Sequence, residues 1–229
     1  MLDKILKIFK KEYQTVNKIE VSKSRLIQNY KYLKSLNKGI KIASVVKSNA
    51  YGHGMINVSQ ILDPLGAPFF CVDSLYEAYQ LLKAKIKTPI LIMGFTDLQN
   101  LKIKKLPFSY AVFDLKLAET LNNYQPSCGI HIFVDTGMGR EGVNLKQLPV
   151  FLEKIKQLKN LKIEGLMSHL ASSEDKGDKL FLSQIKNFHK ARTILKKYHI
   201  KPRWFHIAAS GSILNPQTRP FIASISNMV

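Results

Sequence analysis

A lysine and a tyrosine lie close together where an apolar run passes into a glycine-containing turn. The run is Ile42-Ala43-Ser44-Val45-Val46; Lys47 follows it, and Tyr51 precedes the residues Gly52-His53-Gly54. A β-branched apolar run predicts a buried strand, so we expect Lys47 at its carboxyl end. Ligands bind at the carboxyl ends of strands in parallel α/β folds, where a lysine can form an imine with an aldehyde. The alternative for such a lysine is an ordinary surface residue.

A second segment combines glycines with an arginine in Asp135-Thr136-Gly137-Met138-Gly139-Arg140-Glu141-Gly142. The glycines on either side of Met138 allow the backbone to approach a ligand closely. Arg140 offers a planar fork that suits a carboxylate. The alternative is a surface turn in which Arg140 pairs with Asp135 or Glu141.

Two other predicted strand ends carry a polar residue. His169 ends the segment Glu164-Gly165-Leu166-Met167-Ser168, and Ser210 follows His206-Ile207-Ala208-Ala209. Ser210 and neighbouring backbone amides would suit a phosphate at a strand-to-helix turn. A histidine in such a position is otherwise a hydrogen-bonded structural residue.

The Lys47 turn resembles the pyridoxal-phosphate motif of bacterial alanine racemases. In that family the lysine holds the cofactor as a Schiff base and the tyrosine binds its phosphate. The resemblance implies that Lys47 is catalytic, that Tyr51 and Ser210 bind the phosphate of pyridoxal 5'-phosphate, and that His169 lies against the cofactor and hydrogen-bonds an arginine at its pyridine nitrogen.

The loop around Arg140 resembles the substrate-binding loop of the same family. The resemblance implies that Arg140 contacts both the substrate carboxylate and the phenolic oxygen of the cofactor, with Met138 as a further substrate-binding residue. It implies no metal ligand.

Several positions depart from the family pattern. Phe133 stands where many members have a lysine, often carbamylated, that orients the arginine, and Ala209 replaces an asparagine. Arg219 is followed by Pro220-Phe221-Ile222, which only partly resembles the family's pyridine-facing arginine motif. Asn227-Met228-Val229 is the better match to the segment that leads into that motif.

Alternating apolar runs and helical patterns predict repeated βα units and a parallel sheet. We expect an α/β fold, a (β/α)8 TIM-type barrel that is incomplete at the eighth strand, which begins in the tail Ile222 to Val229. The expected strands are Lys41 to Val46, Pro68 to Val72, Ile90 to Met93, Tyr110 to Phe113, Gly129 to Val134, Ile163 to Ser168 and Trp204 to Ala208. The expected helices are Ser74 to Lys83, Leu115 to Leu121, Leu148 to Leu158 and Lys179 to Lys197.

The domain organisation follows from the same pattern. Residues 1–16 predict a basic amphipathic helix, with Leu2, Ile5 and Leu6 on its apolar face. Residues 17–229 correspond to the racemase N-terminal barrel domain. We expect the family's C-terminal β-domain to be absent, together with the tyrosine that it supplies across a dimer interface as the second base.

Composition narrows the class of protein. The 229 residues carry a formal charge of +19, and Cys71 and Cys128 are the two cysteines, too few for a disulfide framework or a four-ligand zinc site. No signal peptide or membrane-spanning stretch is evident, which favours the cytoplasm. Because lysine dominates the charge and is spread along the chain, we expect no nucleic-acid and no membrane partner.

The sequence therefore predicts a truncated alanine racemase, a pyridoxal-phosphate isomerase that interconverts L-alanine and D-alanine for peptidoglycan. The substrate is a small molecule, and the family is homodimeric. By itself the chain should be weak or inactive. One alternative is a non-catalytic, single-domain pyridoxal-phosphate-binding protein of the homeostasis type. A second is a barrel remnant that pairs its open edge with another chain.

Overall fold

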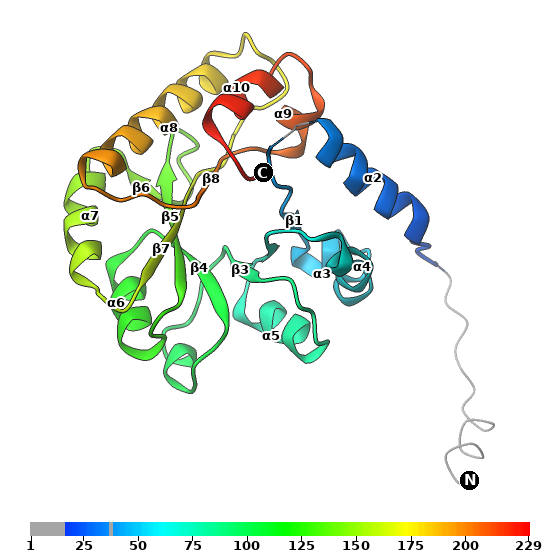
Figure 1. The fold of residues 1–229 in the computed structure, drawn as a ribbon, viewed down its shortest axis with the longest axis horizontal. Coiled ribbons are helices and arrows are strands. Elements are labelled where there is room, and N and C mark those ends of the chain that lie inside the picture. Colours follow the sequence, from blue (N-terminus) through cyan, green and yellow to red (C-terminus); the bar gives the residue numbers. More distant parts are fainter. Residues whose placement is uncertain (1–16, 37–38) are drawn as a thin grey trace.

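The structure is a computed structural model that describes residues 17–36 and 39–229. The amphipathic helix expected over residues 1–16 lies outside the described residues. Figure 1 shows the described part as a ring of helices around a curved sheet.

All strands of the sheet pair in parallel, in the order β1-β2-β3-β4-β5-β7-β8, and β6 pairs with β5. The strands are β1 (Ser44–Val45), β2 (Phe70–Val72), β3 (Ile90–Ile92), β4 (Phe108–Val112), β5 (Gly129–Asp135), β6 (Val143–Asn144), β7 (Lys162–Met167) and β8 (Trp204–His206). This topology confirms the predicted barrel class.

The helices lie outside the strands (Figure 1). They are α2 (Lys23–Leu36), α3 (Lys47–Tyr51), α4 (Met55–Leu62), α5 (Leu75–Lys83), α6 (Leu115–Tyr124), α7 (Leu148–Gln157), α8 (Lys179–Lys197), α9 (Ser210–Leu214) and α10 (Arg219–Ile225), with short 3-10 turns η1 (Asp63–Leu65) and η2 (Asn100–Lys102). In the chain, α3 to α8 lie between strands, whereas α2 precedes β1, and α9 and α10 follow β8. Aspartate side chains cap the N-termini of α6 and α8. The Asp114 carboxylate accepts the Leu117 N–H, and that of Asp178 accepts the Leu180 and Phe181 N–H groups.

The last residues of the chain bridge β8 and the segment that enters β1. The Asn227 N–H donates to the Phe205 carbonyl at 3.0 Å, while the Val229 N–H donates to the Lys41 carbonyl at 2.9 Å. Residues 227–229 thus occupy the position of an eighth strand. The prediction that this strand begins at Ile222 was wrong, because α10 continues to Ile225. Ile222 and Ile225 are both buried at helical spacing, and Pro220 lies in the first turn.

Side chains of alternating residues fill two regions of the core. Phe70 and Val72 pack between sheet and helices, whereas Phe69 and Cys71 point into the barrel. Leu91, Trp204 and Met228 belong to the same interior cluster. The barrel is therefore filled by side chains, and only its end remains for a ligand.

Among the described residues, no helix combines the length and the hydropathy needed to cross a bilayer. Cys71 and Cys128 are both free and buried, and burial raises the pKa of each thiol to about 12.

Candidate functional site

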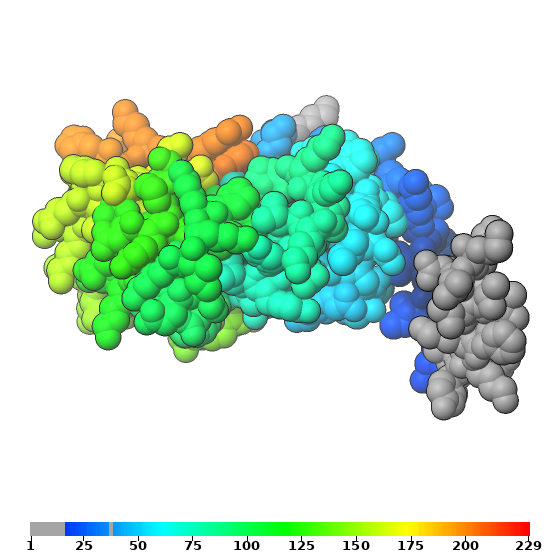
Figure 2. Space-filling view, turned by 90° about the horizontal axis from the view of Figure 1, so that it is seen from below, coloured from blue at the N-terminus to red at the C-terminus, as the bar shows by residue number. Residues whose placement is uncertain are grey.

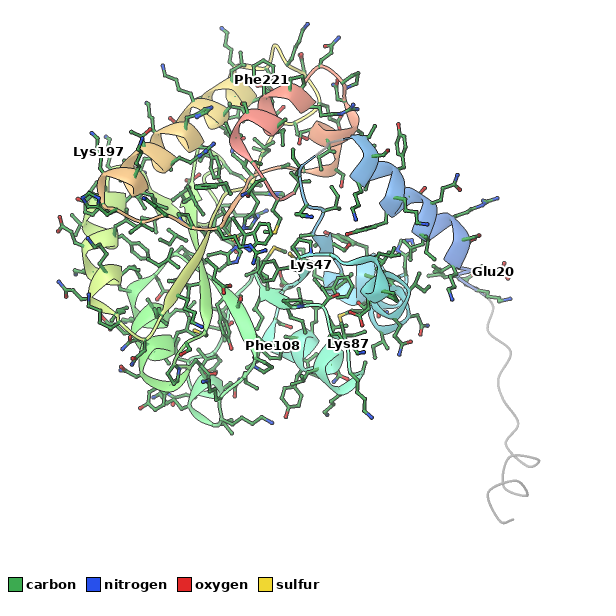
Figure 3. The ribbon with its side chains drawn as sticks, in the orientation of Figure 1. Glu20, Lys47, Lys87, Phe108, Lys197 and Phe221 are labelled. Carbon is green, nitrogen blue, oxygen red and sulfur yellow. The ribbon has the colours of Figure 1, made fainter. Side chains whose placement is uncertain are left out.

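A cavity of about 590 Å³ lies at the carboxyl ends of the strands. Its volume falls within the range of roughly 300–1,000 Å³ that is typical of small-molecule sites. Five of the residues singled out from the sequence line it: Lys47, Tyr51, Arg140, His169 and Ser210. They come from segments that follow β1, β5, β7 and β8, so it is the fold that brings them together. Figure 3 shows Lys47 inside the ring of helices.

Lys47 follows β1 directly after the buried Val46, and its amine faces a carboxylate. Its Nζ lies 3.3 Å from Oδ1 of Asp73, and the two side chains are 34% and 55% exposed. Glu77 joins the neighbouring strand ends, because its carboxylate accepts the N–H of Ser48 at 2.6 Å and the N–H of Asp73 at 2.8 Å. Lys47 is therefore held at a braced strand end, with one carboxylate beside its amine.

The turn after Lys47 is left-handed. The φ angles of Ser48, Asn49, Ala50 and Tyr51 lie between 52° and 55°, and none of these residues is glycine. Such a conformation costs roughly 1–2 kcal/mol per residue, so contacts around it must impose it. One of them is the 2.8 Å hydrogen bond from the Met55 N–H to the Asn49 side chain. The turn places Tyr51 at the cavity, with 62% of its surface exposed.

The loop that carries Arg140 is organised by Asp135. Its Oδ1 accepts the N–H groups of Gly137, Met138 and Gly139 at 2.9, 3.0 and 3.1 Å. Gly142 has a φ of +118°, and a Cβ on it would lie 2.4 Å from the Asp135 nitrogen, so this position requires glycine. Met138 is not among the described residues that line the cavity.

Arg140 takes its carboxylate partner from its own loop. Its Nε lies 3.6 Å from Oε2 of Glu141, as the alternative interpretation of the sequence anticipated, yet both residues line the cavity. Phe133 is buried on the cavity wall and meets Phe113 edge to face, with ring centroids 6.0 Å apart. β5 therefore presents an apolar ring to the cavity at position 133.

His169 follows β7 and Ser210 follows β8, the last two strands of the sheet, whereas Lys47 follows the first strand, β1. Burial lowers the pKa of His169, and the positive charges of Arg140 and Lys47 lower it further. The ring is therefore neutral near pH 7. Ser210 is exposed at the start of α9, directly after Ala209.

Two histidines at the floor of the cavity, the buried His131 and the half-buried His206, were missed as site residues. Nδ1 of His131 lies 2.8 Å from Nε2 of His206, which lines the cavity. Burial lowers the pKa of His206 to about 3, and burial together with His206 lowers that of His131 well below its usual value. Gly165 leaves room for the pair, since a Cβ there would lie 2.2 Å from Nδ1 of His131. The alternation of inward-facing residues along β5 and β8 was the available signal.

Arg219 lies apart from the cavity lining. Its Nε donates to the Ile213 carbonyl at 2.7 Å and its Nη2 to the Leu214 carbonyl at 2.9 Å. These bonds satisfy the last carbonyls of α9, so Arg219 acts as a helix cap. Among the described residues, no group of three or more histidine, cysteine or acidic side chains is placed to hold a metal ion.

Comparisons with known proteins give a consistent result. A family model described as "Alanine racemase, N-terminal domain" matches residues 21–229. The alanine racemase of Geobacter sp. (strain M21) is 35% identical over 207 residues, which are 86% of this chain and 55% of that protein. Alanine racemase 1 of Clostridium acetobutylicum is 33% identical over 207 residues, covering 87% of this chain and 53% of that protein. The chain spans about half the length of the curated relatives it matches.

Solved structures are also similar. The crystal structure of alanine racemase from Bacillus anthracis with bound L-Ala-P has a TM-score of 0.84 at 27% identity, over 95% of this chain and 57% of that one. The alanine racemase from Oenococcus oeni has a TM-score of 0.77 at 29% identity, over 91% of this chain and 61% of that one.

Proposed function

We propose that this chain is the pyridoxal-phosphate-binding barrel of an enzyme that interconverts L-alanine and D-alanine. The chain belongs to the family of alanine racemase N-terminal domains, which supports this proposal. In this proposal the enzyme works in the cytoplasm as a homodimer, and D-alanine serves peptidoglycan synthesis. The observation that carries it is the convergence of Lys47, Tyr51, Arg140, His169 and Ser210 on one cavity.

The donor groups around the cavity suit pyridoxal phosphate. Its aldehyde requires an amine in a fixed position, which Lys47 offers at the end of β1. Its phosphate requires hydrogen-bond donors, and Tyr51 and Ser210, each with a hydroxyl group, line the cavity. Its phenolic oxygen and the substrate carboxylate require a cation, for which Arg140 has the right fork. Apolar side chains, among them Phe133, form the wall between these polar groups.

Within this site, Nζ of Lys47 is the group that we propose removes and returns the proton on one face of the substrate's α-carbon. When bound, pyridoxal phosphate draws electrons from that carbon and makes its proton acidic. Asp73, whose Oδ1 lies 3.3 Å from Nζ, orients the amine. Arg140 fixes the carboxylate, and the neutral ring of His169 adds no charge to the site.

Racemisation also needs an acid–base group on the opposite face of the carbon. The family resemblance assigns this role to a tyrosine of the C-terminal β-domain, whereas residues 21–229 match the N-terminal domain. We therefore propose that the 229-residue chain by itself binds the cofactor weakly and racemises alanine poorly or not at all.

Borohydride trapping tests the cofactor site. The purified chain is mixed with pyridoxal phosphate, reduced and digested, and the labelled peptides are mapped. We expect one label, on Lys47, and its loss in Lys47→Ala. Lys116→Ala, which removes an exposed lysine outside the cavity, is the matched control and keeps the label. Label scattered over many lysines in the wild-type chain contradicts the proposal.

A fusion separates the racemase from the non-catalytic alternative. The C-terminal half of the Geobacter alanine racemase, joined after Val229, supplies the second acid–base group. We expect alanine racemisation that depends on Lys47. A soluble fusion that is labelled on Lys47 but does not racemise alanine favours a pyridoxal-phosphate-binding protein without turnover.

A further inference from the structure

The barrel end opposite the cavity carries a large excess of positive charge. Here helices end and strands begin, and we call this surface the basic end. Its cations, all exposed, are Lys34, Lys41, Lys83, Lys85, Lys87, Lys102, Lys104, Lys105, Lys154, Lys156, Lys159, Lys162, Lys196, Lys197, Lys201 and Arg203. The acidic residues in the same segments are Asp63, Glu153 and Glu164.

These three carboxylates already accept hydrogen bonds from within the chain. Asp63 accepts backbone N–H groups, Glu153 accepts the hydroxyl of Tyr198 at 3.2 Å, and Glu164 accepts that of Ser109 at 3.0 Å. Within the described ranges, no ion pair includes a cation of the basic end. Sixteen cations thus face three carboxylates, and most of the positive charge there is uncompensated.

Helix termini explain only part of this excess. Lysines in the last turn of a helix interact favourably with its dipole, and Lys34, Lys83, Lys154, Lys156, Lys196 and Lys197 are of this kind. The remaining cations lie beyond the last turns of the α-helices, most of them in the segments that lead into the next strand. No helix requires a charge at Lys87, Lys105, Lys159 or Lys201, which suggests another use for the surface.

The cavity end has a different balance. Its carboxylates are Glu20, Asp73, Glu77, Asp97, Asp114, Glu119, Asp135, Glu141, Glu174, Asp175 and Asp178, and its cations are Lys18, Lys23, Arg25, Lys47, Lys116, Arg140, Lys146, Lys176, Lys179 and Arg219. Acidic residues slightly outnumber basic ones there. Charge is therefore distributed unevenly along the barrel axis, and the basic end is strongly positive.

The cations of the basic end are spread over a broad face. They belong to segments that enter β1, β3, β4, β7 and β8, and because these strands are parallel, the segments reach the same end of the barrel. Figure 3 shows two of them, Lys87 and Lys197, on opposite sides of the ring. Seen edge-on, the molecule is wider than it is tall (Figure 2). A flat partner could contact all of these segments at once, whereas a linear polymer would follow only some of them.

We propose that the basic end docks the protein on the headgroups of an anionic phospholipid bilayer. Lysine serves this purpose as well as arginine, since each contributes mainly its charge near such a surface. Arg203 is the one arginine of the group, which disfavours base-specific nucleic-acid recognition. Ile103 and Tyr124, 76% and 46% exposed, lie among the lysines and offer apolar contacts at headgroup depth.

This docking leaves the cavity open on the far side of the barrel. The sequence alone led us to expect no membrane partner, because the lysines are spread along the chain. Folding gathers them on one surface, and the proposal revises that expectation.

Vesicle co-sedimentation with matched charge reversals tests the proposal. The full chain is mixed with vesicles of phosphatidylcholine and phosphatidylglycerol in equal parts, or of phosphatidylcholine alone. One variant combines Lys105→Glu, Lys159→Glu and Lys201→Glu at the basic end. The control combines Lys116→Glu, Lys146→Glu and Lys179→Glu at the cavity end, with the same change in net charge and the same residues 1–16.

We expect the wild-type chain to bind only the anionic vesicles and to be released when salt rises from about 0.1 M to about 0.5 M. The basic-end variant should bind at least about tenfold more weakly, and the control should lose much less. Circular dichroism checks that both variants fold, and the matching lysine-to-glutamine variants repeat the comparison if they do not.

Equal losses in the two variants overturn the proposal, because net charge or residues 1–16 would then account for binding. Binding to single-stranded RNA without binding to anionic vesicles also overturns it and makes nucleic acid the partner. Neither result bears on the Lys47 site, which the borohydride label tests separately.

Discussion

The two ends of the barrel use lysine in different ways. At the cavity end, Lys47 is partly buried, pairs with Asp73 and follows a strand that Glu77 joins to its neighbour. At the basic end, residues such as Lys105 and Lys159 are exposed, and no ion pair among the described residues includes them. The role of Lys47 depends on a few close contacts, whereas the lysines of the basic end act through their number. Substitutions should therefore have large, specific effects at one end and small, additive effects at the other.

The largest effect of a single substitution is expected below the cavity, in Gly165→Ala. The new Cβ would lie 2.2 Å from Nδ1 of His131, whose ring is fully buried. Overpacking of this kind should lower the free energy of unfolding by roughly 3 kcal/mol. Urea denaturation measures it. Gly177→Ala is the control, because its Cβ would come no closer than 3.4 Å to the nearest atom, an Asp175 side-chain oxygen. A Gly165→Ala chain as stable as the control would show that the histidine pair is loosely packed.

An effect at least as large is expected from pH, through the histidine pair below the cavity. Burial lowers the pKa of His206 to about 3 and that of His131 well below its usual value, so both bind protons more readily in the unfolded chain. Their contribution to stability is complete above about pH 6.5 and is lost progressively as the pH falls toward 3. The loss should approach about 1.4 kcal/mol per pH unit for each histidine.

Urea denaturation at pH 7 and pH 5 checks this prediction. A chain with His131→Gln and His206→Gln should lose less stability between the two values than the wild type. His189→Gln, at an exposed histidine, should behave as the wild type does. Identical pH dependence in all three chains would mean that the histidine pair does not govern acid stability.

The smallest effect is expected at the basic end. The combined Lys105→Glu, Lys159→Glu and Lys201→Glu variant should change the free energy of unfolding by less than about 1 kcal/mol. At low salt the change should be stabilising, since it relieves repulsion in a chain of net charge +19. Thermal melts at low and high salt measure it. A large destabilisation would mean that these lysines make structural contacts, and the contrast between the two ends would fail.

Much of the fold could be predicted because local patterns encode it. The expected strand at Gly129 to Val134 is β5, and the expected helix Lys179 to Lys197 matches α8. Apolar runs with β-branched residues and amphipathic repeats depend only on neighbouring residues, so they can be recognised without knowledge of the fold. The tail was predicted less well. Ile222 and Ile225 serve a helix, and whether such a short apolar run forms a strand or a helix depends on what it packs against.

The candidate site was predicted in part for the same reason. Lys47, Arg140 and His169 each end an apolar run or belong to a distinctive loop, and both features are visible in the sequence. The partners of these residues were not. Asp73 and Glu77 become neighbours of the Lys47 turn only because β1 and β2 pair in parallel. The left-handed turn of Ser48 to Tyr51 was also hidden, since only Asn49 adopts that conformation readily and four such residues in succession require contacts from the folded chain.

By itself, the sequence determined the barrel class, the family and the residues able to perform chemistry, because these depend on residue type and short-range spacing. Only the tertiary structure decided that His131 pairs with His206, that Arg219 caps a helix, and that the last residues bridge β8 and the segment before β1. It also decided that lysines spread along the chain gather at one end. The alignment of the parallel strands determines which distant segments touch and where their charges gather. That alignment is a property of the whole folded chain.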